Sequence, residues 1–348
     1  MPDIGFPAGA LARCRQLLEP AMRATVADLH PWTERMAAFT LGWSDIDGTP
    51  VEADTGKGLR PALAMLCAEA AGGTFESAVP GAVAVELVHV FSLVHDDIID
   101  SDERRRHRPA AWKAYGVGPA VLAGDALLAL AVRSAASGPH AAAAAGLLSS
   151  ALVELVHGQT LDMAFEERPW TGPEAVTVAE YTSMAADKTG SLIGCAAALG
   201  VTFAGAPADL ATRMYGMGRD LGLAFQMVDD VLGIWGDPSR TGKPVFGDLR
   251  RRKKTLPVLA ALAPSLPRSS GSAGTSASGE LALLLSSGAD DEDAVRLAAD
   301  LIEKEGGRDR ALSMAADHAS RALDTLDAVF PDARDLRALI TSLLDRTH

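Results

Sequence analysis

Residues 82–100 read AVAVELVHVFSLVHDDIID, and this stretch decides the fold. Its first fourteen residues are almost wholly apolar, yet the paired aspartates Asp96 and Asp97 follow directly, and Asp100 comes one turn later. Residues four apart lie on one face of a helix, so Asp96 and Asp100 are stacked while Asp97 is rotated away by about 100°. Like charges on one face repel each other. The stretch therefore predicts a buried helix whose end carries a cation site.

Helical periodicity continues on both sides of this stretch. Apolar residues recur three and four apart, Ala and Leu are abundant, and no alternating β-branched run competes. The predicted helices span residues 59–72, 77–104, 118–136, 141–166, 188–204, 207–235, 253–263, 291–305 and 308–329. A low-complexity stretch at residues 264–279, PSLPRSSGSAGTSASG, predicts a flexible surface loop. We therefore predict an all-α fold with one domain over residues 1–348.

Composition excludes several classes of protein. The formal net charge of −13 argues against a general nucleic-acid binder, because phosphate backbones attract basic surfaces. The three cysteines, Cys14, Cys67 and Cys195, have no CxxC spacing, so neither a disulfide framework nor a zinc site is indicated. No signal peptide is recognisable, and the apolar run at 117–132 is too short to cross a bilayer comfortably. We expect a cytoplasmic protein without a membrane span.

Basic residues follow the first aspartates. Arg104, Arg105, Arg106 and Arg108 come within a dozen residues of Asp96, and guanidinium forks match phosphate oxygens. Ion pairs with neighbouring acids are the alternative, and some of the four arginines serve only that purpose. Upstream, Lys57 and Arg60 precede a helix in TGKGLRP, and His89 lies two turns before Asp96. Taken alone, His89 is more simply explained as a core residue.

A second acidic helix is predicted at residues 221–235, LGLAFQMVDDVLGIW. Gln226 and Asp229 share a face, and the spacing of four residues predicts that Asp230 pairs with Gln226. Lys243 and the run 250–254 follow; a solvated basic patch is the alternative reading of that run. Lys188 and Thr189 stand in ADKTGSLIG, where the helical pattern is interrupted beside a glycine.

The two regions combine the same two types of ligand. Carboxylates suit a hard divalent cation such as Mg²⁺, which commonly keeps only one or two protein carboxylates and completes its shell with water and phosphate. Arginine and lysine suit the phosphate oxygens themselves. The sequence therefore predicts chemistry on a metal-bound diphosphate ester.

Taken in order, these motifs resemble those of the trans-isoprenyl diphosphate synthases (polyprenyl synthetases). The counterparts are GKxLRP, the histidine seven residues before the first aspartate, DDxxDxxxxRR, GQxxD at residues 158–162, KTG, FQxxDD, GDxxxxGK and KxTxP. The match covers roughly residues 50–260, and the details look most like bacterial geranylgeranyl diphosphate synthases. This resemblance implies a bundle of long helices around a central substrate cavity, and a homodimer. A long, nearly all-apolar helix at 118–136 also favours a dimer.

The resemblance implies a role for each matching position. It implies three Mg²⁺ ions, chiefly on Asp96, Asp100 and Asp229, within the wider set of metal candidates Asp96, Asp97, Asp100, Asp229 and Asp230. It implies an isopentenyl diphosphate site of Lys57, Arg60, His89 and Arg106. It implies an allylic diphosphate site of Arg105, Lys188, Thr189, Gln226, Lys243 and Lys253. The residues implied to be catalytic are Asp96, Asp100, Arg105, Lys188, Asp229 and Lys243.

This sequence also departs from the family pattern. Gly233 replaces the final aspartate of the second DDxxD, so that motif offers only Asp229 and Asp230. Gly58 stands where many members have arginine, His107 replaces a glycine, and Phe246 sits in a turn that usually contains glycine.

Product length is expected to depend on the residues before Asp96. Phe91 lies five residues before it, about 7.5 Å along the axis at helical rise, and Ser92 beside it is small. In the family, an aromatic residue here without an insertion in DDxxD resembles geranylgeranyl diphosphate synthases. Farnesyl diphosphate is the alternative product. A class I terpene cyclase and a non-catalytic partner subunit are the other readings; Lys57, Arg60 and His89 argue against the former, and the retained aspartates against the latter.

Overall fold

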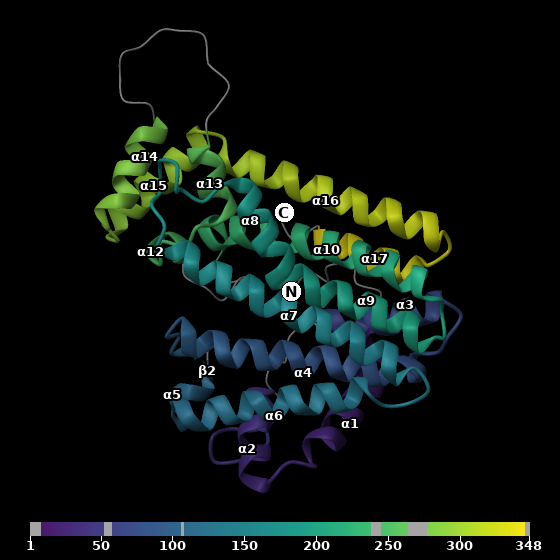
Figure 1. The fold of residues 1–348 in the computed structure, drawn as a ribbon. Helices are drawn as coiled ribbons and strands as arrows, with labels where there is room; N and C mark the ends of the chain where they lie inside the picture. Colours follow the sequence, from purple (N-terminus) through teal and green to yellow (C-terminus); the bar gives the residue numbers. More distant parts are fainter. Residues whose placement is uncertain (1–7, 52–57, 106–107, 238–244, 264–276, 345–348) are drawn as a thin grey trace. The chain divides into compact units, whose positions relative to one another are not determined.

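The computed structural model describes residues 8–51, 58–105, 108–237, 245–263 and 277–344. These residues are almost entirely helical, with one short hairpin (Figure 1). The helices before the hairpin are α1 (Ala8–Val26), α2 (Pro31–Thr40), α3 (Leu59–Ala70) and α4 (Phe75–Ile99). The hairpin pairs β1 (Arg104–Arg105) with β2 (Arg108–Pro109) in antiparallel register. After it come α5 (Ala111–Tyr115), α6 (Val117–Ala135), α7 (Ala141–Glu166), α8 (Val178–Ala185), the π-helix η1 (Ala186–Gly190), α9 (Ser191–Phe203), α10 (Ala208–Trp235), α12 (Gly247–Arg250), α13 (Leu256–Leu262), α14 (Ala277–Ser287), α15 (Glu292–Lys304), α16 (Gly307–Val329) and α17 (Arg334–Leu344).

The chain forms two compact units that interleave along the sequence. Unit 1 comprises Met1–Leu152, Leu192–Gly218 and Asp324–Ser342, and unit 2 comprises Val153–Ser191, Arg219–Leu323 and Leu343–His348. The prediction of a single domain stays a prediction, because such interleaving is compatible with one domain or with two.

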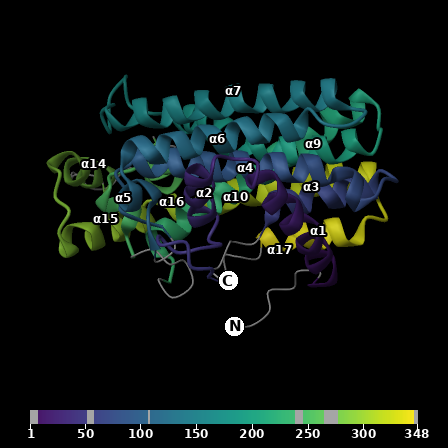
Figure 2. The same cartoon turned by 90° about the horizontal axis from the view of Figure 1, so that it is seen from below.

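Helix α4 is the centre of unit 1. A capping box starts it, because the Thr74 hydroxyl accepts from Ser77 N and the Ser77 hydroxyl accepts from Thr74 N. It packs against α3 and α6, and both views show α4 and α6 side by side (Figures 1 and 2). The predicted helix over 77–104 was wrong at its end: α4 stops at Ile99, Ser101 has a positive φ of 56°, and Arg104 already belongs to β1.

Two glycines allow close packing in unit 1. A Cβ on Gly200 of α9 would lie 2.1 Å from the carbonyl oxygen of Ala64 on α3, so only glycine permits this approach. Likewise, a Cβ on Gly81 of α4 would lie 3.0 Å from the ring of Phe203. The predicted helices therefore pack at close range around a core rich in alanine.

The described residues of unit 2 include two apolar clusters. One gathers side chains of α8, α10, α13 and α16 around the fully buried Tyr181, and the other surrounds Ile234 with residues of α13, α14 and α15. Helix α14 begins at Ala277, so the loop predicted over 264–279 was too long at its end; residues 264–276 lie outside the described part. The sequence did not predict helix α8, nor α1, α2, α5, α12, α14 and α17.

Within the part of the chain that the structure describes, three helices, α4, α6 and α7, are long and apolar enough to cross a membrane by length and composition alone. Residues 117–132 are part of a longer helix, because α6 extends to Ala135 and has 19 residues; the expectation that this run is too short to cross a bilayer was wrong. Within the protein, 61% of the most apolar window of α4 is buried, but only 33% of that of α6 and 28% of that of α7. Burial thus accounts for the apolar surface of α4, whereas α6 and α7 leave apolar surface exposed.

Candidate active site

Unit 1 presents the first aspartates at the end of α4. Asp96 is half-buried, and Asp100 is the exposed C-terminal cap of the helix. Asp97 is buried and accepts three hydrogen bonds from Arg105: Nε donates to Oδ1 at 2.9 Å and to Oδ2 at 3.0 Å, and Nη2 donates to Oδ1 at 2.6 Å. Burial raises the pKa of Asp97, while the Arg105 pair opposes the rise. The rotation of Asp97 away from Asp96 and Asp100 thus gives it a nearby cation as partner, as its helical position indicates.

The basic residues after α4 divide into two groups. Arg108 donates to the Ser44 carbonyl oxygen at 2.6 Å and stacks on the Phe39 ring, so it anchors α2 and the loop after it. Arg105 is held over the end of α4 by the hairpin and by Asp97. Arg106 and His107 lie outside the described residues. Arg105 is placed beside the first aspartates by its ion pair with Asp97.

Arg60 and His89 also belong to unit 1. Arg60 opens α3, and its Nε atom is inaccessible to solvent with no hydrogen-bond partner among the described residues. Burial lowers the pKa of Arg60, and the negative charge of Glu86 partly offsets that effect. An unsatisfied guanidinium nitrogen is unfavourable in the folded protein. Arg60 is half-buried as a residue, and the accessible part of its guanidinium group suits a phosphate oxygen. His89 is half-buried on α4, and Ser92 donates to its carbonyl oxygen; Lys57 lies outside the described residues.

In unit 2, Asp229 and Asp230 have different surroundings. Asp229 is half-buried on α10. Asp230 is buried and accepts three hydrogen bonds, from Tyr181 Oη at 2.6 Å, Leu256 N at 2.9 Å and Gln226 Nε2 at 2.8 Å. Burial raises the pKa of Asp230 to about 7. Asp230 therefore ties α8 and α13 to α10, which leaves Asp229 as the more open carboxylate.

Lys188 and Thr189 lie on η1, so the predicted interruption of the helix is a single turn of π-helix. Lys188 Nζ lies 2.6 Å from Asp162 Oδ2, and Thr189 Oγ1 donates to Gln226 Oε1 at 2.8 Å. Gly158 lies against this turn, because a Cβ there would be 2.2 Å from Lys188 N. Single π-helical turns inside α-helices are frequent at functional sites. The GQxxD segment thereby gains a physical meaning: its glycine admits η1, and its aspartate meets Lys188.

The basic run 250–254 is divided: Arg251 and Arg252 are exposed, whereas Lys253 and Lys254 have partners within unit 2. Lys254 is buried, donates to the Arg168 carbonyl oxygen at 2.6 Å and lies over the Trp170 ring. Lys253 pairs with Glu166 at 2.9 Å and lies 4.0 Å from Asp162, the carboxylate that Lys188 also contacts. Two lysines thus converge on Asp162; Lys243 lies outside the described residues.

The carboxylate of Asp248 fills the space beside Gly233. A Cβ on Gly233 would lie 1.9 Å from Asp248 Oδ2, so an aspartate at 233 would collide with it. Phe246 holds a left-handed φ of 62°, which explains why a glycine is usual in this turn, and its N–H donates to Ile234 O at 3.1 Å. A carboxylate therefore stands next to the position where the family has its last aspartate, but it comes from another segment.

Several contributing residues escaped the sequence reading. Asp162 was quoted in a motif without a role, and its signal was its place in GQxxD, four residues after Gly158. Tyr181 and Asp248 carry no local signal, because their partners are 49 and 15 residues away in the chain. The periodicity of apolar residues within one helix does not predict such pairing between distant segments.

The donor set fits Mg²⁺ only with help from a substrate. Within the described ranges, no group of three or more His, Cys, Asp or Glu side chains could hold a metal ion. Mg²⁺ characteristically takes one or two carboxylates and completes its shell with water and phosphate oxygens. Asp96 with Asp100, and Asp229, are suited to such partial coordination.

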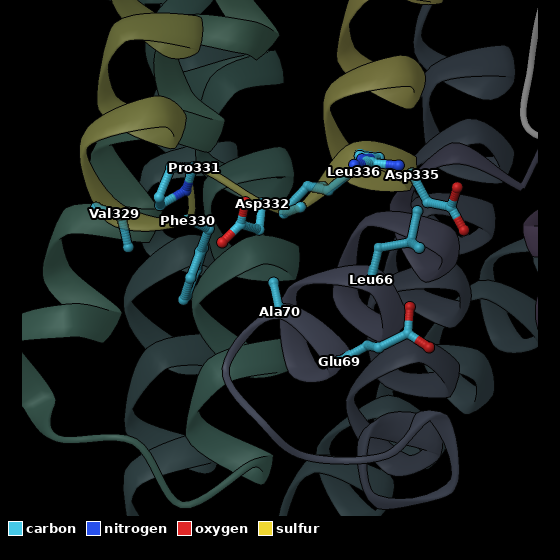
Figure 3. A pocket seen from close by; sticks show the side chains of 11 residues that line it. Leu66, Glu69, Ala70, Val329, Phe330, Pro331, Asp332, Asp335 and Leu336 are labelled. Carbon is cyan, nitrogen blue, oxygen red and sulfur yellow. The ribbon is translucent and has the colours of Figure 1, made fainter.

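A surface pocket of about 540 Å³ lies elsewhere in unit 1 (Figure 3). Leu66, Glu69 and Ala70 of α3 line it together with residues 329–336 at the turn between α16 and α17. It contains none of the predicted site residues.

An all-helical fold whose helices carry paired aspartates, with arginines and lysines suited to phosphate oxygens nearby, is typical of the isoprenoid synthase class. A model of the family described as Polyprenyl synthetase matches residues 50–274, and the chain belongs to this family. It is 43% identical over 341 residues to a (2E,6E)-farnesyl diphosphate synthase of Mycobacterium tuberculosis, covering 97% of this chain and 92% of that one. It is 44% identical over 255 residues to a geranylgeranyl diphosphate synthase of the same species, covering 72% and 71%.

The structural comparison agrees. The crystal structure of a polyprenyl synthetase from Streptomyces coelicolor matches with a TM-score of 0.86 and 42% identity, over 98% of this chain and 99% of that one. The predicted family and all-α fold are confirmed, and the chain is a prenyltransferase of the short-chain prenyl diphosphate synthases.

Proposed function

We propose that this prenyltransferase uses Mg²⁺ to condense isopentenyl diphosphate head to tail with an allylic diphosphate, and that its product is geranylgeranyl diphosphate. The observation that carries the proposal is that each unit has its own cations beside an aspartate-bearing helix: Arg60 and Arg105 in unit 1, Lys188 and Lys253 in unit 2. Two diphosphate substrates require two such sets.

Asp96, Asp100 and Asp229 are the proposed Mg²⁺ ligands, and three ions per active site remains part of the proposal. When bound, Mg²⁺ supplies Lewis-acid stabilisation of the departing diphosphate. Asp97 and Asp230, also predicted as ligands, have other partners: Asp97 holds Arg105, and Asp230 holds Tyr181, Leu256 and Gln226. We assign these two carboxylates to supporting the site.

The remaining roles follow from the cations. Lys188, Thr189, Gln226, Arg105 and Lys253 would orient the allylic diphosphate and neutralise its charge as the C–O bond breaks. Arg60 and His89 would hold isopentenyl diphosphate, with Lys57, Arg106 and Lys243 completing the two sets outside the described residues. The double bond of isopentenyl diphosphate then attacks the allylic cation, so positioning at about 3–3.5 Å replaces any side-chain nucleophile. The departing pyrophosphate accepts the proton that is lost.

Phe91 supports a twenty-carbon product. Its ring is buried on α4, packs on His95 with centroids 4.6 Å apart, and lies beside Gly124 of α6. A rigid aromatic ring at this depth would limit the length of the chain. Farnesyl diphosphate is the second candidate, favoured by the farnesyl diphosphate synthase that aligns with 97% of the chain.

We further propose a cytoplasmic homodimer without a membrane span. Helix α6 exposes Leu122 and Val132, and α7 exposes Val153, Val156 and Met163. Large apolar side chains repeated along two helices are costly in water and typical of surfaces that a partner covers.

The isopentenyl diphosphate assignment can be tested with Arg60→Ala. Losing a charge-assisted contact to one substrate should raise the KM of isopentenyl diphosphate by roughly tenfold or more, with the KM of the allylic substrate little changed. Steady-state kinetics with each substrate varied in turn measures both. Arg308→Ala, which removes another arginine whose Nε lacks a described partner, serves as control. Equal rises of both KM values would contradict the assignment.

A further inference from the structure

Four side chains form a closed circuit around η1. Asp187 Oδ2 lies 2.8 Å from His157 Nδ1, and Asp187 Oδ1 accepts from Arg219 Nη2 at 2.5 Å. The other arm of Arg219 donates from Nη1 to Glu154 Oε2 at 3.0 Å. Glu154 and His157 are three residues apart on α7, so the circuit runs from α7 to α10, to η1 and back to α7.

Asp187 is the buried centre of this circuit, with its side chain only 12% exposed. A buried carboxylate is stable when both oxygens have donors, and Arg219 and His157 supply one each. Because a carboxylate only accepts, His157 must carry its proton on Nδ1. The Ser191 hydroxyl donates to the carbonyl oxygen of Asp187 at 2.5 Å, so the main chain is held as well.

The circuit holds the turn that carries Lys188 and Thr189. Around it, backbones meet without intervening side chains: a Cβ on Gly222 would lie 2.6 Å from Gly190 Cα, and Gly158 lies as close to Lys188. Glycine allows this close approach, but it has no side chain that could fix the rotation of η1 about its own axis. The directional bonds of Asp187 supply that fixation.

We infer that Asp187 is a positioning residue: held by Arg219 and His157, it sets the direction in which η1 presents Lys188 and Thr189 to the allylic diphosphate. This role rests on the proposed function, in which those two residues bind that substrate. A rotation of η1 would break the Lys188–Asp162 and Thr189–Gln226 contacts together. Misplacement of a binding group by about 1 Å can cost about 100-fold in rate.

The chain contains a matched control. Asp220, beside Arg219 in the same unit, lies 2.7 Å from His318 Nδ1 and accepts from Arg321 Nε at 3.3 Å. It has the same pair of partners, a histidine and an arginine, but its partners are on α16. Asp220→Asn therefore removes a comparable charge without touching η1.

The test compares full-length Asp187→Asn and Asp220→Asn in KM for farnesyl diphosphate, KM for isopentenyl diphosphate, and melting temperature. Asparagine keeps the shape but turns one acceptor into a donor that faces Arg219 or His157. We expect Asp187→Asn to raise the KM of farnesyl diphosphate by about tenfold or more, with that of isopentenyl diphosphate within about twofold of wild type. Asp220→Asn should leave both values near wild type.

A double-variant comparison shows whether Asp187 acts through the turn. In a Lys188→Ala, Thr189→Ala background, Asp187→Asn should add no further rise in the KM of farnesyl diphosphate. If Asp187→Asn melts too low for assay, His157→Gln, which alters an exposed ring, should show the same split between the two KM values.

Three results would contradict the positioning role of Asp187. A lowered melting temperature with both KM values unchanged would reduce Asp187 to a structural residue and overturn the inference alone. An additional rise in the double background would also overturn it. If Lys188→Ala itself leaves the KM of farnesyl diphosphate unchanged, the binding assignment of Lys188 fails and this inference fails with it.

Discussion

Asp96 and Asp97 are neighbours in the chain, yet the helix gives them different surroundings. Rotation by about 100° leaves Asp96 half-buried and turns Asp97 into the core, where Arg105 pairs with it. Asp229 and Asp230 repeat this division on α10. The sequence predicted the rotation of Asp97 and the pairing of Gln226 with Asp230, because both follow from helical spacing. It did not predict Tyr181 or Asp248, because those partners arrive from other segments.

At the same scale, Phe91→Ala tests the proposed limit on chain length. Removing the ring should open space for further five-carbon additions and shift the products to longer chains, with little effect on the first condensation. Mass analysis of the products measures this. If Phe91 instead serves only to pack α4 against α6, truncation would lower stability by about 3–5 kcal/mol without lengthening the product. A well-folded Phe91→Ala with unchanged product length would place the limit on another helix.

At the scale of elements, long stretches of apolar periodicity predicted the positions of helices, and an interruption of the periodicity predicted a break in a helix. Helices α7 and α10 match their predicted ranges to within a residue, and the interruption at KTG is the π-helix η1. Helices α8 and α17 were not predicted. They have 8 and 11 residues, so each offers only about two or three turns of periodic pattern. The end of α4 was overestimated, because the charged run after Asp100 continues the helical pattern although the chain turns into a hairpin.

Helix α8 offers a prediction of pH dependence. Its first turn is a capping box of Thr177 and Glu180, and Arg168 donates to Glu180 at 2.8 Å. This hydrogen bond with Arg168 is the largest cause that lowers the pKa of Glu180, from 4.5 to about 2. Because the folded state lowers this pKa, the stabilisation is present above pH 4.5 and is lost as the pH falls towards 2.

Glu180→Gln should therefore lower the free energy of unfolding at neutral pH and flatten its decline between pH 5 and pH 2. Urea unfolding measured across this pH range shows the effect, with the exposed Glu167→Gln as a control for removing one charge. The same acid slope in Glu180→Gln and in wild type would contradict the assignment of this cap.

At the scale of the whole molecule, the sequence predicted an all-α enzyme, but not the division into two interleaved units. Composition and periodicity are local properties, whereas the units join segments more than 100 residues apart. The exposed apolar residues of α6 and α7 were foreseen in part, because the apolar character of 118–136 was evident in the sequence. Their real exposure required the structure, since it depends on what the rest of the chain covers.

The homodimer is expected to persist at micromolar concentration, because burial of the apolar residues of α6 and α7 drives association. Light scattering of the purified protein should give twice the 36.1 kDa of one chain. Val153→Lys on α7 should weaken the dimer, because a charge would enter an apolar contact. Asp293→Lys, at an exposed and already polar position, is the control. A monomeric mass for wild type would contradict the proposed assembly.

Mass analysis can identify the products that the purified protein makes from isopentenyl diphosphate and each allylic primer, with Mg²⁺ and with the metal removed by EDTA. We expect prenyl diphosphates extended by whole five-carbon units, with geranylgeranyl diphosphate as the final product, and no product in EDTA. Undiminished condensation in EDTA, or cyclised hydrocarbon in place of an extended diphosphate, would contradict this expectation.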